Sequence, residues 1–350
     1  MKLKGVGIKQ IASEAAVSIA TVDRVLHNRG GVNAKTHEKI KELIKKYNYQ
    51  PNILAKRLAS KKIIRFAAIL PEASADLAYW LAPLDGIKQA AEQIRHYGLE
   101  IEVFFYDSTN EESFRKASRK ILKADFQGVV IASVFPGEAI SLSRACDLRN
   151  IPYVYIDTNI SDMNNLSYVG ADLFKSGYSV AHLVDYLVKD SDKILICNIS
   201  KYAGRASDAK AKEEGFRYYF KDKSRDVNML RINIESSDKS VIKRRLKGII
   251  LKQRPKIIIV LNSRAFYVAE VLKSLSQNNI FLIGYDFIPM NIEYLTTGEI
   301  DFLVCHRSRE QGYLGVFSLY NFVVKKEMVE KSLYSPIDII TKENFEFYKN

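Results

Sequence analysis

Apolar residues recur at helical spacing in three short groups near the start of the chain. They repeat at intervals of three and four within residues 8–15, within residues 19–26 and between Asn33 and Tyr47. Ser18 and Asn33 each precede a group, where a side-chain oxygen can cap the first turn of a helix. Two short helices joined by a tight turn, with a third completing a small core, are typical of a helix-turn-helix domain.

A short linker separates this domain from the rest of the chain. Pro51 ends the third helix, and residues 52–60 (NILAKRLAS) predict one more helical segment, which is basic and has no core of its own. We therefore expect a helix-turn-helix domain in residues 1–50, a hinge helix or linker in residues 51–62, and a larger domain in residues 63–350.

Beyond residue 62 the pattern changes to apolar runs that alternate with amphipathic helices, which is typical of βαβ units in a parallel sheet. About ten strands are too many for one open sheet, so we predict an α/β fold with two lobes, each a doubly wound parallel sheet. One lobe would hold residues 63–165 and 298–325, and the other residues 166–297 with the C-terminal stretch. The strand candidates are residues 63–70, 100–107, 128–133, 153–157, 193–198, 227–234, 256–261, 281–286 and 302–306.

Composition excludes several protein classes. The 350 residues are 47% hydrophobic and 27% charged, as in soluble globular proteins, which excludes collagen, intrinsic disorder and a disulfide miniprotein. The three cysteines have no CxxC spacing and lie in apolar sequence, which favours reduced core thiols in a reducing cytosol. The first residues lack the apolar region of a signal peptide, and no apolar run approaches about 20 residues. We expect a cytoplasmic protein without a membrane span.

The positive charge is concentrated at the N-terminus. Residues 1–62 hold 14 Lys and Arg against 4 Asp and Glu, a net charge of +10. The whole chain holds 53 against 40, so the other 288 residues hold 39 against 36, a net of +3. Such a concentration of charge indicates a polyanionic partner. A helix-turn-helix pattern favours nucleic acid over an anionic membrane, which would be bound by one longer amphipathic helix.

The sequence GIKQIASEAAVSIATVDRVLHNRGGVNAKTHEKIKELIKKYNYQPNILAKRLAS resembles the DNA-binding region of LacI-type transcriptional regulators throughout its length. The segments YVYIDTN, EEGFRYYF, LIGYDFIP and REQGYLGV are similar to the periplasmic sugar-binding protein fold, particularly the ribose-binding type. This resemblance implies a homodimeric regulator on a near-palindromic double-stranded DNA operator. Its operator affinity would depend on a sugar or sugar derivative bound between the two lobes.

The resemblance also assigns roles in the second helix, which would enter the major groove. Ile19 and Ala20 match the specificity pair, Arg24 the arginine that reads guanine, and Ser18 and Thr21 the phosphate contacts. Ser18 could equally be a plain helix cap, and Arg24 a surface arginine. Asp23 replaces the serine common in the family, and an acid near phosphates is unfavourable unless it pairs with Arg24 or accepts from a cytosine amino group.

In the linker, the resemblance places Asn52, Ala55 and Leu58 against DNA. Leu58 matches the leucine that family members insert into the minor groove, where an apolar wedge unstacks a base step and bends the duplex. The alternative is a leucine that packs against the sensor.

Polar residues at the ends of strands indicate the ligand site, because ligands bind at the carboxyl ends of strands in open α/β sheets. Asp157, Asn262 and Asp286 each end a strand, and carboxylates and amides suit the hydroxyls of a polyol. By resemblance, Tyr79 and Trp80 match the aromatic pair that stacks on a sugar ring, although a single Trp is more often a core residue. Lys212 and Thr158 stand where the family usually has arginine. His306 stands where it has glutamine, or is an interior histidine. Because the bidentate geometry of arginine is lost, the ligand could be a sugar, a sugar acid or another polyol.

Enzyme and transport functions find less support. The chain lacks GxSxG, HExxH and Walker A sequences, and it shows no cluster of metal ligands, so we expect no enzyme activity and no cofactor. The main alternative is an α/β enzyme acting on a sugar-like substrate, with the N-terminal domain as a DNA anchor. A transport binding protein would need a signal peptide.

Overall fold

The computed structural model describes residues 7–26, 29–47, 49, 63–73, 75–200, 206–277 and 279–348. They divide into two compact units, Met1–Lys62 and Ile63–Asn350. In the first unit the three predicted helices are present as α1 (Ile8–Ala15), α2 (Ile19–Leu26) and α3 (Ala34–Lys46). The predicted cap is also confirmed, because the Asn33 side chain accepts a hydrogen bond from the Thr36 N–H at 2.8 Å. Each helix contributes a fully buried residue to one small core: Ile11, Val22 and Ile40.

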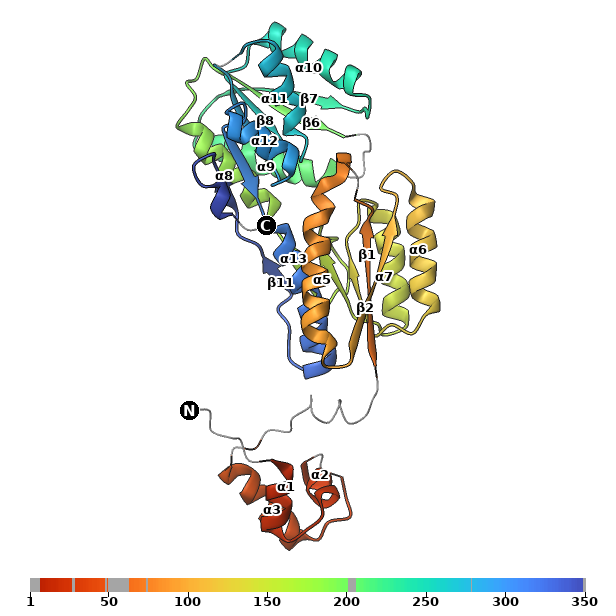
Figure 1. Cartoon of the computed structure of the whole chain (residues 1–350). Helices are drawn as coiled ribbons and strands as arrows, with labels where there is room; N and C mark the ends of the chain where they lie inside the picture. The colour runs from red at the N-terminus through yellow and green to blue at the C-terminus, as the bar shows by residue number, and fades with distance from the viewer. Residues whose placement is uncertain are drawn as a thin grey trace. The chain divides into compact units, whose positions relative to one another are not determined.

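The second unit contains two six-stranded sheets of equivalent strand order, which define a first and a second lobe (Figure 1). The first lobe has the order β11-β5-β4-β3-β1-β2, and the second has the order β12-β10-β9-β8-β6-β7. All neighbouring strands are parallel except β12, which pairs with β10 in the antiparallel sense. The predicted pair of doubly wound parallel sheets is therefore confirmed.

The elements of the first lobe are β1 (Ile64–Pro71), the 3₁₀ helix η1 (Ala75–Trp80), α5 (Leu81–Arg95), β2 (Leu99–Tyr106), α6 (Glu111–Lys123), β3 (Gly128–Ile131), α7 (Pro136–Leu148), β4 (Tyr153–Ile156), β5 (Ser167–Gly170), α13 (Ser308–Tyr320), the π-helix η3 (Asn321–Lys325) and β11 (Ser332–Tyr334). Those of the second lobe are α8 (Leu173–Asp185), β6 (Lys193–Ile199), α9 (Ala206–Asp222), β7 (Asn228–Ile234), α10 (Lys239–Gln253), β8 (Ile257–Val260), α11 (Ala265–Ser274), β9 (Phe281–Tyr285), α12 (Pro289–Thr297), β10 (Phe302–Cys305), β12 (Asp338–Ile340) and the 3₁₀ helix η4 (Phe345–Phe347).

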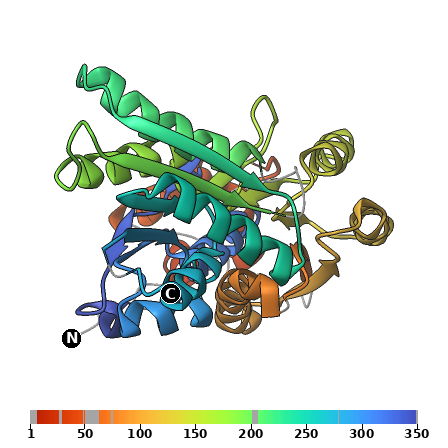
Figure 2. The same ribbon diagram turned by 90° about the horizontal axis from the view of Figure 1, so that it is seen from above.

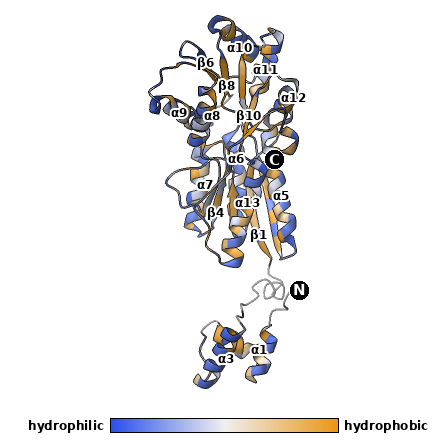
Figure 3. Cartoon of the chain, turned by 90° about the vertical axis from the view of Figure 1, so that its left-hand side faces the viewer, coloured by the Kyte–Doolittle hydropathy of each residue, from blue (hydrophilic) through white to orange (hydrophobic). Residues whose placement is uncertain are grey.

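Helices cover the buried strands of both lobes. In the first lobe, α5 and α13 lie side by side (Figure 1, Figure 2). In the second, α8 packs on α9, and α11 contacts both α10 and α12. The strands are hydrophobic, whereas the helices carry polar residues on their outer faces (Figure 3). Within the described ranges, every helix is too short or too polar to cross a bilayer.

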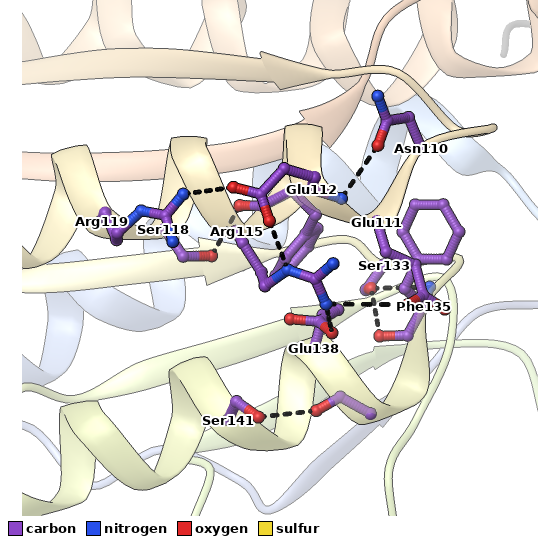
Figure 4. Close-up of polar contacts among 12 residues, drawn as sticks. Asn110, Glu111, Glu112, Arg115, Ser118, Arg119, Ser133, Phe135, Glu138 and Ser141 are labelled. Carbon is purple, nitrogen blue, oxygen red and sulfur yellow. Dashed lines mark hydrogen bonds and ion pairs between the residues drawn. The ribbon is translucent and has the colours of Figure 1, made fainter.

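An ion-pair network joins α6 to α7 on the outside of the first lobe (Figure 4). The Arg115 guanidinium donates to Glu112 at 2.8 Å and to Glu138 at 2.7 Å. Asn110 caps α6 by accepting from the Glu112 N–H at 3.0 Å. Because the Arg115 side chain is 42% exposed, solvent screens these pairs, and each contributes little to stability. The residues of this network do not line the cavity described below.

The boundaries of the two lobes differ from those expected. Residues 167–170 form β5 of the first lobe rather than the start of the second, and residues 302–305 form β10 of the second lobe rather than part of the first. The C-terminal stretch supplies one strand to each sheet. The chain therefore crosses between the lobes three times, after β5, after β10 and between β11 and β12. The reason is that β5 and β10 extend the sheets of the strands that precede them, β4 and β9.

Candidate functional site

The exposed face of α2 carries the residues that the sequence assigns to base recognition. Val22 and Val25 are buried against the core of the three-helix unit. Ile19, Ala20 and Arg24 lie on the solvent side, and Ile19 is 44% exposed even though it is a large apolar residue. An exposed isoleucine and an exposed arginine on one helix suit contact with thymine methyl groups and guanine edges in a major groove.

Ser18 caps α2, as predicted. Its Oγ accepts a hydrogen bond from the Thr21 N–H at 3.1 Å, and the Oγ atoms of Ser18 and Thr21 are 2.9 Å apart. The Asp23 carboxylate lies 3.6 Å from the Arg29 guanidinium, so an acid on this helix has a basic neighbour other than Arg24. Asn52, Ala55 and Leu58 lie outside the described residues.

A small cavity lies between the lobes of the second unit. Its volume is about 30 Å³, roughly the space that one or two water molecules need. The lobes therefore meet closely, and a sugar-sized ligand requires them to open or their side chains to move. Six of the seven residues predicted to bind ligand line this cavity: Tyr79, Asp157, Lys212, Asn262, Asp286 and His306. Ala171, Leu173, Asn198, Asp208, Ala209, Leu261 and Gln311 complete the wall.

Asp157 and Asp286 lie directly after β4 and β9, so the ends of two strands bring one carboxylate from each lobe to the cavity. The hydroxyl of Tyr79 donates a short hydrogen bond to Asp157. Burial and the nearby Asp157 carboxylate raise the pKa of Tyr79 well above its usual value. The phenol therefore stays protonated and acts as a donor at neutral pH.

Lys212 and His306 are buried in the wall of the cavity, and both contact Tyr285. The Lys212 Nζ donates to the Leu261 carbonyl at 3.0 Å and lies 4.1 Å from the centroid of the Tyr285 ring. His306 Nε2 is 2.8 Å from the Ser176 Oγ, whose distance to the Tyr285 hydroxyl is 3.3 Å. Burial and the Lys212 charge lower the pKa of His306 to about 3. The imidazole is therefore neutral at pH 7, and it is both a cavity residue and a hydrogen-bonded interior histidine.

Two predicted ligand residues have mainly internal roles. Asn262 donates its amide to the Asn198 Oδ1 at 3.0 Å and the Ile199 carbonyl at 2.9 Å. These bonds fix the end of β8 and leave little of the amide for a ligand. Trp80 is 1% exposed and packs edge-on against Tyr79, with ring centroids 5.2 Å apart. The structure places only Tyr79 of this aromatic pair on the cavity wall, because adjacent side chains leave the backbone in different directions.

Asp208 and Gln311 also line the cavity but were not predicted from the sequence. Asp208 lies in the first turn of α9 and accepts a hydrogen bond from the Thr158 Oγ1 at 3.0 Å. Since Thr158 follows β4 and α9 belongs to the second lobe, this bond links the two lobes beside the cavity. The replacement of arginine by Thr158 was the only signal in the sequence that pointed to this contact.

Comparison with known proteins gives two family matches. Residues 66–327 match the periplasmic binding protein domain, and residues 7–52 match the lacI family of bacterial regulatory proteins. The HTH-type transcriptional regulator RegA of Clostridium acetobutylicum is 33% identical over 185 residues, which are 52% of this chain and 52% of that protein. The chain spans about half the length of the curated relatives it matches.

Solved structures extend the similarity across the second unit. A candidate LacI transcriptional regulator from Bacteroides fragilis is 26% identical, with a TM-score of 0.77 over 82% of this chain and 100% of that one. GanP, a glucose-galactose binding protein from Geobacillus stearothermophilus, is 21% identical, with a TM-score of 0.69 over 81% of this chain and 99% of that one. At that identity, the likeness to GanP concerns the fold alone.

Proposed function

Because the chain belongs to the periplasmic binding protein domain family and carries a lacI-family segment at its N-terminus, we propose that it is a ligand-controlled, sequence-specific DNA-binding transcriptional regulator. The observation that carries this proposal is the exposed face of α2, where Ile19 and Arg24 face solvent in a segment of net charge +10. Ser18, Ala20 and Thr21 would complete the DNA contacts of this helix. The same chain holds a polar cavity between two lobes, where a ligand can favour one arrangement of the lobes over another.

The chemistry of the cavity supports a sugar or sugar derivative as the ligand. Carboxylates of Asp157, Asp208 and Asp286 accept hydrogen bonds, and Tyr79 and Lys212 donate them. A polyol presents hydroxyls that both donate and accept, so it can satisfy both kinds of group. Proteins of similar fold include one described as binding glucose and galactose and one solved with D-arabinose.

Regulation would act through a homodimer on a near-palindromic operator. In this arrangement Asn52, Ala55 and Leu58 of two linkers meet in the minor groove, and lobe movement changes the cost of pairing them. The protein would work in the cytoplasm, where its DNA is, without enzymatic turnover and without a cofactor or metal.

Selection of duplexes from a random pool tests the DNA-binding proposal. We expect enrichment of a near-palindromic site, with affinity that falls by roughly 10³-fold or more between about 50 mM and 200 mM salt if six or more phosphates are neutralised. A pool without enrichment, or affinity indifferent to salt, would contradict the proposal. Thermal denaturation with neutral sugars, sugar acids and other polyols would then identify the ligand class and its effect on operator binding.

A further inference from the structure

Gln311 is a buried polar side chain in the wall of the cavity. It lies in the first turn of α13, just after the second crossing between the lobes, and is only 2% exposed. Neither charge nor position relative to a strand end distinguishes it in the sequence. Burial of a primary amide is costly unless its donors and its acceptor find partners.

The NH₂ group of this amide binds the segment in which the chain crosses from the second lobe to the first. The Gln311 Nε2 donates to the His306 carbonyl at 2.8 Å. The Oε1 has no hydrogen-bond partner among the residues that the structure describes. Turning the amide over would place two oxygens against each other at the His306 carbonyl, so the hydrogen bond fixes the orientation. The unsatisfied atom is therefore an acceptor that needs a donor.

Packing holds Gln311 in place. At Gly312, a Cβ atom would lie 2.0 Å from the Pro83 carbonyl oxygen, and at Gly86 one would lie 1.8 Å from the Arg309 carbonyl oxygen. The backbones of α5 and α13 are thus in direct contact on both sides of Gln311. A side chain on so rigid a support offers its acceptor at a fixed position, and a ligand need not order it on binding.

We propose that the Gln311 Oε1 accepts a hydrogen bond from one hydroxyl of the bound sugar and so helps to determine which sugar binds. The inference rests on the proposed function, in which a sugar occupies this cavity. Gln311 lies in the first lobe, whereas Lys212 and Asp208 approach from the second, so a sugar bound to all three contacts both lobes. The site discriminates between sugars because an analogue without that hydroxyl leaves the buried Gln311 Oε1 unpaired.

A mutant cycle on the full-length protein tests this contact. Calorimetry would measure the binding of D-glucose, D-galactose, D-arabinose and D-allose, and of each monodeoxy analogue of the sugar that binds most tightly, to the wild type and to Gln311→Met. We expect the wild type to lose about tenfold or more in affinity when one particular hydroxyl is removed. In Gln311→Met, which has similar size and no acceptor there, the same removal should cost less than twofold.

A control separates this effect from general damage. Gln93 lies on α5 and accepts from the Tyr313 hydroxyl at 2.8 Å at the surface, so Gln93→Met should retain the wild-type pattern of deoxy penalties. If Gln311→Met weakens every analogue by the same factor, Gln311 only supports the crossover, and the inference is wrong. If the wild type binds none of the four neutral sugars, this inference is wrong, whereas the screen of sugar acids and other polyols and the operator-binding assay test the proposed function separately.

Discussion

Asp157 and Asp286 occupy equivalent positions in the two lobes and share a rare backbone conformation. Each directly follows the fourth strand of its lobe in chain order, β4 or β9, and each has a positive φ, 69° for Asp157 and 74° for Asp286. Each also donates its N–H to a valine carbonyl of the next strand, at 3.1 Å for Asp157 and 3.0 Å for Asp286. Left-handed backbone in a residue with a Cβ atom costs free energy and often marks a functional position.

The aspartates can be tested without disturbing this backbone, because Asn tolerates positive φ as well as Asp does. Asp286→Asn should weaken binding of the identified ligand by about tenfold or more, since a carboxylate makes stronger hydrogen bonds than an amide. Calorimetry measures this change, and operator binding without ligand should persist. Asp162→Asn, at an exposed residue with φ of 60°, is the matched control. Unchanged affinity in Asp286→Asn would remove Asp286 from the site.

The bond between Thr158 and Asp208 should favour the closed arrangement of the lobes. Thr158→Val removes the donor at nearly constant size, and a hydrogen bond of this kind contributes about 0.5–1.5 kcal/mol. We expect a ligand affinity about 2–10-fold lower and a larger radius of gyration by small-angle scattering of the free protein. Thr158→Ser keeps the hydroxyl and should resemble the wild type in both measurements. Equal behaviour of the Val and Ser variants would show that the bond does not hold the lobes together.

His306 predicts a particular dependence of stability on pH. Its pKa is lowered from 6.5 to about 3 in the folded protein, so the unfolded chain binds a proton below pH 6.5 that the folded protein excludes. The unfolding free energy is therefore undiminished above pH 6.5 and falls as the pH decreases toward 3, by about 2 kcal/mol at pH 5. Urea unfolding at pH 7.5 and 5.0 measures this decrease in the unfolding free energy of the wild type. In His306→Gln the decrease between the two pH values should be smaller by the contribution of His306. Equal losses would mean that His306 accepts a proton in the folded state.

Arg24 should contribute specificity as well as charge. Arg24→Ala should cost about 1–3 kcal/mol on the selected operator and less on random DNA, because a base contact is lost only at the specific site. Arg24→Lys retains the charge but not the bidentate hydrogen-bonding geometry of arginine. Its affinity for random DNA should therefore be closer to that of the wild type than its affinity for the operator. Fluorescence anisotropy with both duplexes measures the difference. Equal losses on both duplexes would show that Arg24 reads no base.

The parts of the fold that local sequence determines could be predicted. The caps at Ser18 and Asn33, the helices of the first unit and the two strand-end aspartates all follow from short-range periodicity and from the rule that ligands bind at strand ends. The strands β5, β11 and β12 could not, because SYVG, SLY and DII mix polar with apolar residues and lack the continuous apolar run of the strands that were predicted. The limits of the lobes were wrong because β5 was missed and because the sheet that β10 joins depends on its neighbour β9, which periodicity does not reveal.

The roles of side chains that depend on contacts with residues far away in the sequence could not be predicted either. In the sequence, Asp208 is one of several acidic residues in a polar helix. Only the fold brings Thr158 next to it. Gln311 lines the cavity where glycines let α5 and α13 approach closely, a contact that its neighbours in sequence do not reveal. Trp80 and Tyr79 are adjacent in sequence, and the pattern alone could not decide which of them faces the cavity.

The strands β11 and β12 make the completion of both lobes depend on residues 332–340, which lie far along the chain from the first strands. The sheet of the first lobe also needs α13 as its cover, so neither lobe is finished until residues beyond 332 have left the ribosome. The three-helix unit, in contrast, has its own core and is complete by about residue 49. At about 5–20 residues per second, translation separates the two events by roughly 15–60 s. A nascent chain therefore holds a finished three-helix unit before either lobe, or the cavity between the lobes, is complete.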